Sequence, residues 1–483
     1  MRRVIAWFRS HPLTTGILVF VGVIFSLHLF ANWRAEVRWQ RYCTEARARG
    51  VKLTLTEFAT PEIPDAENFA ALPMFRAIFN GGVQRPLELP SVSGARPSLP
   101  DLIKGEKMDW PAFQKYCQDA GWISEATDSP PRDVLRGLEH YAPQFQQWRE
   151  WPDRPKCRFP LELDKGFAMP LPHLSTLMDA AKHFSLRMRA HLTLGDSAAA
   201  YVDFRDGSQA YRALRGEPTF ISGLVRISVL TTMLNGVGEG MRDRAWNEAE
   251  LKKIDAEMAT ISIWPDYLFA IASERAFGNW VFDRLATSSP RQRASILNNS
   301  GGIPGLNYPV ALLSLIPKRL FRDNQLRQNQ YFDELAARVT QDGQHFDPDL
   351  PTPSDTEHMT GFLDQYYFFL CRLSQPVYGE VIKRYVSLQT RLDEARLAIA
   401  LERFHLARGT YPETLTELVP EFIPAIPADT YSKKALIYRR QQGATFLLYG
   451  VGENRTDDGG VINPKLVERR QLDEIWIYAP PPQ

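Results

Sequence analysis

Histidine and carboxylate side chains are the first candidates for chemistry, and a few of them stand at helical spacing. Asp179 and His183 are four residues apart, so on a helix they share one face and can form a pair. Such helix-face pairs are usually structural. His183 and His191 are eight residues apart, which separates them by about 12 Å along a helix and about 80° around it. That separation is too large for both rings to bind one metal ion.

A second collection of oxygen and imidazole ligands lies in one polar segment. Its members are Asp342, His345, Asp347, Asp349, Asp355 and His358. The segment also carries several prolines, and this composition is typical of a solvated linker. We therefore expect a linker here rather than a metal site.

No catalytic motif accompanies these residues. The sequence has no HExxH, no GxxxxGK[ST], no GxSxG and no GxGxxG after a strand. The glycine-rich run 236–240 lies in a helical neighbourhood, where it predicts a bend or close packing. Glu139-His140 and Glu274-Arg275 have no partner that the sequence identifies, and no nucleophile stands out. We therefore predict no enzymatic site and keep an enzyme as an alternative.

Composition bounds the class of protein. The chain has 483 residues, enough for two or three domains of the usual size. Its formal net charge of +1 gives no global attraction to nucleic acid, so we expect no nucleic-acid partner. Hydrophobic residues at 44% and charged residues at 23% exclude a mostly disordered chain and a polytopic membrane protein.

One segment near the N-terminus has the length of a membrane span. No charged residue occurs from Ser10 to Trp33, and a helix of that length reaches about 36 Å, against roughly 30 Å of hydrocarbon. We predict a cytoplasmic tip and transmembrane anchor over 1–33, with residues 13–33 in the membrane. A cleaved signal peptide is the alternative, but the run is long and shows no small-x-small cleavage site.

The arginines that flank this segment leave the orientation open. Those before it are Arg2, Arg3 and Arg9, and those after it are Arg34, Arg38, Arg41, Arg47 and Arg49. The positive-inside rule then favours a cytoplasmic body, although long domains translocate largely regardless of flanking charge. The C-terminal segment favours the opposite orientation: a single-pass protein of the cytoplasmic membrane with most of the chain extracytoplasmic.

The four cysteines, Cys43, Cys117, Cys157 and Cys371, are widely spaced. No Cys-x-x-Cys unit exists, so a compact metal or redox site of that type is excluded. Outside the cytoplasm the even number permits disulfides, and four scattered buried thiols are the alternative.

The middle of the chain is predicted to be helical. Residues 34–170 combine short helices with proline-rich connections, and residues 171–390 form an α-helical hairpin body. A stripe at 3–4 spacing predicts a first long helix through Leu174, Leu177, Met178, Ala181, Phe184, Met188 and Leu192. Gly195 then ends this helix and Asp196 caps the next.

Further helices are expected over 221–242, 248–261, 265–285, 309–339 and 358–408. The apolar run Pro309–Ile316 is too short to cross a bilayer, so buried helix is predicted. The basic residues Lys318, Arg319 and Arg322 leave contact with a membrane surface open. The stretch Ala190–Leu214 weakly resembles a tetratricopeptide-like hairpin, but no clean 34-residue period supports a repeat array.

Residues 391–483 change pattern and predict a small α+β head. A helix ends at Arg408-Gly409, and a proline-bounded extended segment follows. Two β-rich runs, 435–440 and 445–451, flank a short turn and predict a hairpin, and 474–478 predicts a last strand.

The order of these pieces resembles the globular head of the major pseudopilin of type II secretion. The matching pieces are Ala400-Leu401-Glu402-Arg403-Phe404, Arg408-Gly409-Thr410-Tyr411-Pro412, Leu418-Val419-Pro420, Ile426-Pro427, Leu448-Tyr449-Gly450-Val451-Gly452 and Asp457-Asp458-Gly459-Gly460. The likeness covers roughly the last ninety residues. It implies a head outside the cytoplasmic membrane, which is why we expect that orientation.

The resemblance also implies a calcium site in the loop after the hairpin. By motif position, Asn454 stands where the family has an aspartate and Asp473 resembles a later ligand, with Asp457 and Asp458 as additional candidates. Hard cations need several oxygen ligands, which such a turn can supply. Asparagine for aspartate removes one negative charge. The alternative is an Asp-Gly surface turn whose carboxylates accept backbone hydrogen bonds.

The chain departs from a pilin subunit in its N-terminal half. Gly16 is followed by apolar residues, with no glutamate in the span, and a long body separates the anchor from the head. We therefore expect a mainly α protein with a transmembrane helix, an irregular hairpin body and a pseudopilin-like α+β head with an antiparallel sheet. Its expected work is binding or scaffolding with protein partners in the envelope. A periplasmic hydrolase with a site between helices is the alternative, and a pilin-like filament subunit the third.

Overall fold

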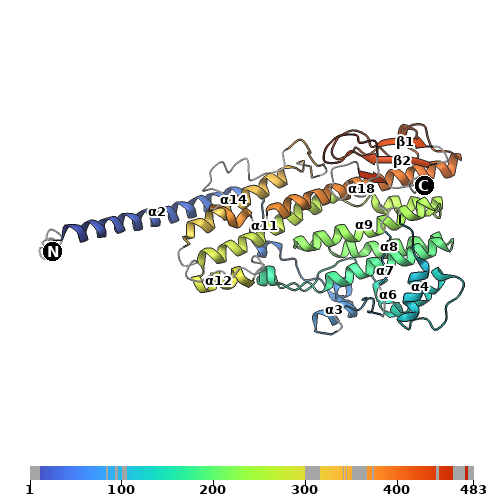
Figure 1. The fold of residues 1–483 in the computed structure, drawn as a ribbon, viewed down its shortest axis with the longest axis horizontal. Coiled ribbons are helices and arrows are strands. Elements are labelled where there is room, and N and C mark those ends of the chain that lie inside the picture. Colours follow the sequence, from blue (N-terminus) through green and yellow to red (C-terminus); the bar gives the residue numbers. More distant parts are fainter. Residues whose placement is uncertain are drawn as a thin grey trace.

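The computed structural model describes residues 11–476, apart from 83–84, 93–95, 101–105, 300–315, 341, 344, 351–366, 373–374, 442–444 and 461–473. A long N-terminal helix leads into an elongated helical body, with a small sheet at the end opposite the anchor (Figure 1). The mainly helical class predicted from the sequence is confirmed.

The elements follow one another along the chain as helices first and strands last. The helices are α2 (Pro12–Ala48), α3 (Pro73–Phe79), α4 (Trp110–Asp119), α5 (Pro130–Leu138), α6 (Ala142–Trp148), α7 (His173–Thr193), α8 (Ser197–Ala213), α9 (Phe220–Arg242), α10 (Glu248–Met258), α11 (Ile263–Thr287), α12 (Pro290–Asn299), α14 (Lys318–Ala337), α17 (Phe369–Arg372) and α18 (Gln375–Arg408). Short 3-10 segments are η1 (Leu55–Phe58), η2 (Asp65–Glu67), η3 (Phe69–Ala71), η5 (Glu139–Tyr141), η6 (Leu163–Ala168) and η7 (Leu415–Leu418). The strands are β1 (Ile437–Gln441), β2 (Thr445–Gly450) and β3 (Glu474–Trp476).

Helix α2 is long and apolar enough to span a membrane, as the sequence predicts. Its first two-thirds project away from the body (Figure 1), and large apolar side chains from Leu13 to Trp33 are exposed there. Helix α9 passes the same test of length and hydropathy, but more than half of its apolar window is buried among other helices. Among the described residues, α2 alone therefore presents an apolar surface of membrane length.

The last part of α2 packs against the body. Ala35, Trp39, Tyr42 and Cys43 are buried at spacings of three and four, which places them on one face of the helix. This face lies on α14. The backbone N–H of Arg319 donates to Asn32 Oδ1 at 2.9 Å, so α14 begins beside the end of the exposed apolar stretch.

Two predicted helices are shorter than expected in the described residues. The helix expected over 309–339 is described as α14, from Lys318, and Pro309–Leu315 falls outside the described residues. The helix expected over 358–408 is described from Phe369, as α17 and then α18. Its N-terminal part also falls outside the described residues.

Polar side chains fill the contact between α2, α11 and α14, and we call this set the junction network. Its members are Glu36, Tyr42, Arg275, Asn279, Asp283, Arg322, Gln325, Asn329 and Asp333. Arg275 Nη1 lies 2.7 Å from Asp333 Oδ1 and 3.0 Å from the Tyr42 hydroxyl oxygen. Asn329 Nδ2 donates to Asn279 Oδ1 at 2.6 Å. The anchor is therefore joined to the body by hydrogen bonds of fixed direction.

The hairpin predicted at Gly195-Asp196 is confirmed. Gly195 ends α7 with a φ of 81°, a left-handed conformation that glycine adopts without strain. Asp196 then accepts a hydrogen bond from the Ala199 backbone N–H at 2.9 Å and caps α8. The two helices consequently pack against each other as antiparallel neighbours.

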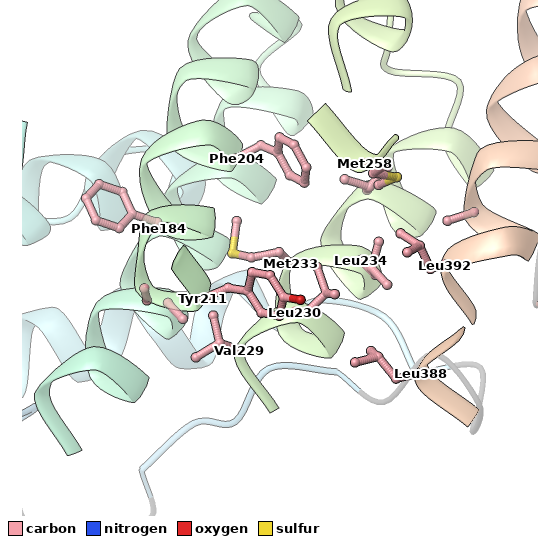
Figure 2. Close-up of a cluster of buried hydrophobic side chains, with 14 of the residues drawn as sticks. Phe184, Phe204, Tyr211, Val229, Leu230, Met233, Leu234, Met258, Leu388 and Leu392 are labelled. Carbon is pink, nitrogen blue, oxygen red and sulfur yellow. The ribbon is translucent and has the colours of Figure 1, made fainter. Parts of the chain in front are cut away.

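The centre of the body is apolar. Figure 2 shows Phe204 of α8 gathered with Met233 and Leu234 of α9, and Leu392 of α18 beside them; Phe184 of α7 points to the other side of its helix. Each of these side chains is almost fully buried. The same continuous core extends into the C-terminal sheet, so the helix α18 serves both regions.

The glycine-rich run 236–240 serves close packing, one of the two roles predicted for it. A Cβ atom on Gly236 would stand within 2.1 Å of Met188 Cε, and one on Gly240 within 2.3 Å of Trp246 Nε1. Gly240 therefore lets α9 and the following loop approach this closely, whereas at Gly236 the neighbouring atom is the flexible end of the Met188 side chain. The run lies inside the continuous helix α9.

The predicted strands form a three-stranded antiparallel sheet in the order β1-β2-β3. Ile437 pairs with Tyr449, and Leu448 pairs with Trp476. Phe446 and Leu448 are buried on the face that β2 turns to α18. The short predicted helix through Leu415 and Leu418 is present as η7.

The region 34–170 contains short helices around an aromatic cluster. Phe69 meets Trp148 edge to face at 5.1 Å between ring centroids, and Phe75 meets Phe159 in the same way at 5.2 Å.

The four cysteines are free thiols. Cys43, Cys117 and Cys371 are buried, and Cys157 is half-buried.

Candidate functional site

A cavity of about 620 Å³ lies in the body between α7, α9, α18 and the connection that precedes α4. Asp179, Lys182, His183, Leu186 and Arg189 line it from α7, spaced so that they form one stripe along that helix. Thr231, Thr232 and Asn235 contribute from α9, and Arg391 contributes from α18. The volume is within the usual range for small-molecule sites.

The charge on the cavity wall is unbalanced. Arg189 forms a two-pronged ion pair with Glu239 at 2.7 and 2.8 Å, and Asp179 pairs with Arg85 at 2.7 Å. Lys182 and Arg391 form no ion pair within the described part of the chain, although the charge of Lys182 lies near enough to Asp179 to act on its pKa. Two cations therefore face the cavity without an ion pair of their own.

Arg96 adds a third positive charge from the connection before α4. Its guanidinium donates to the Leu89 backbone carbonyl oxygen, a neutral acceptor, and it has no ion pair among the described residues. The cavity wall thus holds three cations, Arg96, Lys182 and Arg391, that form no ion pair with any carboxylate among the described residues. A site of this kind attracts anions.

The rest of the wall is apolar. Leu89, Leu99 and Pro100 line it from the connection, Phe113 from α4 and Leu186 from α7. Pro100, Phe113 and Leu186 are buried, and Leu89 and Leu99 are half-buried. Apolar walls with a few placed polar groups are typical of ligand sites in proteins.

His183 lines the cavity with an unpaired nitrogen. Its Nδ1 is 2.7 Å from the Asp179 backbone carbonyl oxygen, which can only accept, so Nδ1 carries the proton. Nε2 is then an acceptor, and it has no hydrogen-bond partner among the described residues. Burial, with the nearby charges of Lys182 and Arg187, lowers the pKa of His183 to about 4. The ring is therefore neutral at pH 7.

The histidine and carboxylate pair predicted on this helix has a different geometry from the one expected. His183 bonds to the backbone of Asp179, while the Asp179 carboxylate pairs with Arg85. His191 points elsewhere and lies 3.6 Å from Asp203. The two histidines have separate partners.

The polar segment that begins at Asp342 contacts the C-terminal head. Asp347 and Asp349 pair with Lys433 at 2.8 and 2.6 Å, and Asp349 also pairs with Arg455 at 2.8 Å. These ion pairs hold the segment against the head, and the carboxylates of Asp347 and Asp349 stay partly exposed, which agrees with the solvated linker expected. Asp355 and His358 fall outside the described residues.

The calcium candidates make contacts of an ordinary turn in the described residues. Asp457 accepts from the Tyr449 hydroxyl and from the Gly459 backbone N–H, each at 2.8 Å. These bonds hold the pKa of Asp457 below its usual range, the Tyr449 bond most strongly. Asn454 donates to Asp458 at 2.9 Å, and Asp473 lies outside the described residues. The calcium site stays a prediction.

Among the described residues, no three histidine, cysteine, aspartate or glutamate side chains stand close enough together to hold a metal ion.

A serine, a histidine and a glutamate meet in the body, and their order matters for the hydrolase alternative. Glu217 lies 2.9 Å from His173 Nε2 and also accepts from the Ser222 hydroxyl. A nucleophilic triad needs the histidine between the serine and the acid. Here the glutamate is in the middle and all three groups are buried, so the cluster joins α7 to α9 structurally.

Sequence reasoning did not find the cavity. Lys182 and Arg391 come from helices far apart in the chain, and neither belongs to a motif. His183 was singled out, but for its spacing to other ligands. Comparisons with known protein families, with curated proteins and with solved structures find no match for this chain.

Proposed function

We propose that this chain is a single-pass membrane-anchored binding protein of the cell envelope, whose ligand site is the cavity lined by α7, α9 and α18. The observation that carries the proposal is a cavity with apolar walls and three cations that form no ion pair among the described residues, in a body fixed to a membrane-length helix. Groups kept unpaired on the wall of a cavity are available to a ligand.

The proposed site is tested with a small neutral dye, 1-aminoanthracene, whose fluorescence rises in apolar surroundings. The full chain in phosphatidylcholine nanodiscs should take up the dye beyond the level of empty nanodiscs. Thr231→Trp and Leu99→Trp each place an indole in the cavity from opposite walls and should abolish the extra signal. Equal uptake by the wild type and by both folded variants would contradict the proposal.

The proposed orientation places the body and head outside the cytoplasm. It rests on the resemblance of residues 391–483 to an extracytoplasmic head. Arg34, Lys318 and Arg319 lie near the end of the exposed apolar stretch and favour the opposite orientation by the positive-inside rule. Protease added to intact spheroplasts should degrade the C-terminal hundred residues. Protection of that segment, with degradation after lysis, would place the body in the cytoplasm.

A scaffold role for the head is the second part of the proposal. The sheet lies at the end of the body opposite the anchor (Figure 1), where a protein partner in the envelope can reach it. Calcium bound by Asn454, Asp457, Asp458 and Asp473 would order the loop that follows β2. A pull-down from solubilised membranes, with and without a calcium chelator, should give a partner set that depends on calcium. Asp457→Asn with Asp458→Asn should then lose the same partners.

A further inference from the structure

The residues that line the cavity divide into two kinds of chemistry. Lys182, Arg391 and Arg96 provide positive charge, and Thr231 and Asn235 provide neutral hydrogen-bonding groups. Leu99, Phe113 and Leu186, among others, provide apolar surface. A ligand that satisfies the whole wall must carry both an anionic group and an apolar part.

From this division we propose that the cavity binds a small amphiphile with one anionic oxygen headgroup, a carboxylate or a phosphate monoester, and a short hydrocarbon portion. Lys182 and Arg391 hold the headgroup, and the leucine and phenylalanine side chains cover the hydrocarbon. The inference rests on the proposed function, because it names the class of ligand for the same site.

Two features of the site favour an anion over a neutral or cationic ligand. The carboxylate that lines the cavity, Asp179, forms its ion pair with Arg85, which leaves Lys182 without an ion pair although its charge acts on Asp179. Lys182 and Arg391 come from different helices, so a headgroup between them replaces solvent around two charges. Charge-assisted hydrogen bonds of this kind are about twice as strong as neutral ones.

The experiment compares octanoate, octyl phosphate, octan-1-ol and octyltrimethylammonium as displacers of 1-aminoanthracene from the full chain in phosphatidylcholine nanodiscs. Octanoate and octyl phosphate should bind at least tenfold more tightly than octan-1-ol, and the cationic compound should bind most weakly. Lys182→Met and Arg391→Met should each weaken octanoate about tenfold, the loss expected for one charge-assisted contact. Both variants should keep the affinity for the neutral dye within about twofold.

Arg384→Met is the matched control. Arg384 is an exposed cation on the same helix, α18, and it does not line the cavity. Its replacement should leave all affinities unchanged. The proposal of an anionic ligand would be overturned if octanoate and octan-1-ol bind equally well. It would also be overturned if Lys182→Met and Arg391→Met both leave the affinity for octanoate unchanged. In either case, dye uptake by the cavity would still support the binding function. If the wild-type chain takes up no more dye than empty nanodiscs do, the proposed function itself is overturned.

The headgroup can come from a free amphiphile or from a membrane lipid, and one further arm separates these sources. Native mass spectrometry of the chain purified from its own membranes reports what occupies the site. A bound lipid with a phosphate-monoester headgroup, such as lysophosphatidic acid, that Arg391→Met loses and Arg384→Met keeps identifies the bilayer as the source. A bound fatty acid or alkyl phosphate with the same dependence identifies a free amphiphile.

Discussion

The body core and the junction network stabilise contacts between helices in opposite ways. In the core, Phe204, Met233 and Leu234 contact one another through apolar atoms alone (Figure 2). In the junction, Arg275 and Asn329 are buried to a similar degree and contact their neighbours through hydrogen bonds. Apolar packing contributes free energy in proportion to buried area and tolerates small rotations, whereas hydrogen bonds weaken steeply with misalignment.

The difference shows where the molecule needs a fixed orientation. Buried hydrogen-bond networks add little net stability but penalise every arrangement that leaves a partner unpaired. A network at the contact of α2 and α14 therefore sets the rotation of the body relative to α2. The core has no hydrogen-bond network of this kind at its centre. It supplies the stability on which that orientation depends.

The largest expected effect is in the core. Phe204→Ala removes a side chain that is 1% exposed and leaves a cavity between α8 and its neighbours. The free energy of unfolding should fall by about 3–5 kcal/mol. Urea denaturation of the full chain in nanodiscs, followed by far-ultraviolet circular dichroism, measures it. If Phe204→Ala lowers the free energy of unfolding less than Asn329→Ala does, the comparison between the body core and the junction network is reversed.

The second effect is a pH dependence beside the junction. Burial raises the pKa of Glu274 to about 7, although the Tyr378 hydroxyl donates to it at 3.1 Å. The folded state then keeps a proton that the unfolded state releases near pH 4.5, so stability falls as pH rises from about 4.5 to about 7. Over that window the loss should approach about 3 kcal/mol. Glu274→Gln should abolish this fall in stability between about pH 4.5 and pH 7. If the free energy of unfolding of the wild type and of Glu274→Gln changes with pH in the same way, the prediction is wrong.

The third effect sharpens the role of the network. Asn329→Ala removes the donor that lies 2.6 Å from Asn279 Oδ1 and should lower the free energy of unfolding by about 1–3 kcal/mol. Nitroxide labels on the exposed end of α2 and on α14 should also report a wider distance distribution by double electron–electron resonance. Phe204→Ala should leave that distribution narrow. A wide distribution in both variants would mean that orientation depends on stability alone.

The smallest effect concerns charge at the margin of the core. Arg396 on α18 pairs with Asp255 on α10 at 2.9 Å, with both side chains partly exposed. Arg396→Met should change the free energy of unfolding by about 0–1 kcal/mol, and the difference should shrink in high salt. A loss as large as that of Asn329→Ala would show that exposed and buried polar contacts count equally here.

Local patterns in the sequence predict much of the fold. The 3–4 spacing from Leu174 to Leu192 predicts α7, Gly195-Asp196 predicts the turn, and the β-rich runs around residue 443 predict the hairpin. These signals succeed because each depends on neighbours within a few positions. The resemblance of the head to a pseudopilin and the calcium ligands stay predictions.

The candidate site escaped sequence reasoning for a physical reason. Lys182 and Arg391 are ordinary surface-type residues in their own helices, and only the packing of α7 against α9, and α9 against α18, brings them to one cavity. In the same way, the polar face of α14 looks like a solvated face until α2 and α11 cover it. Whether a charged side chain is buried depends on how two helices pack together, so the sequence of one segment does not predict it.

By itself the sequence determined the membrane-length helix, because an uncharged run of that length needs no partner to be recognised. It also determined the helix ends and strand runs, because capping, glycine φ angles and side-chain alternation act over a few residues. Tertiary structure alone decided which polar groups are buried and which cations remain unpaired, because solvation and ion pairing depend on elements that are distant along the chain.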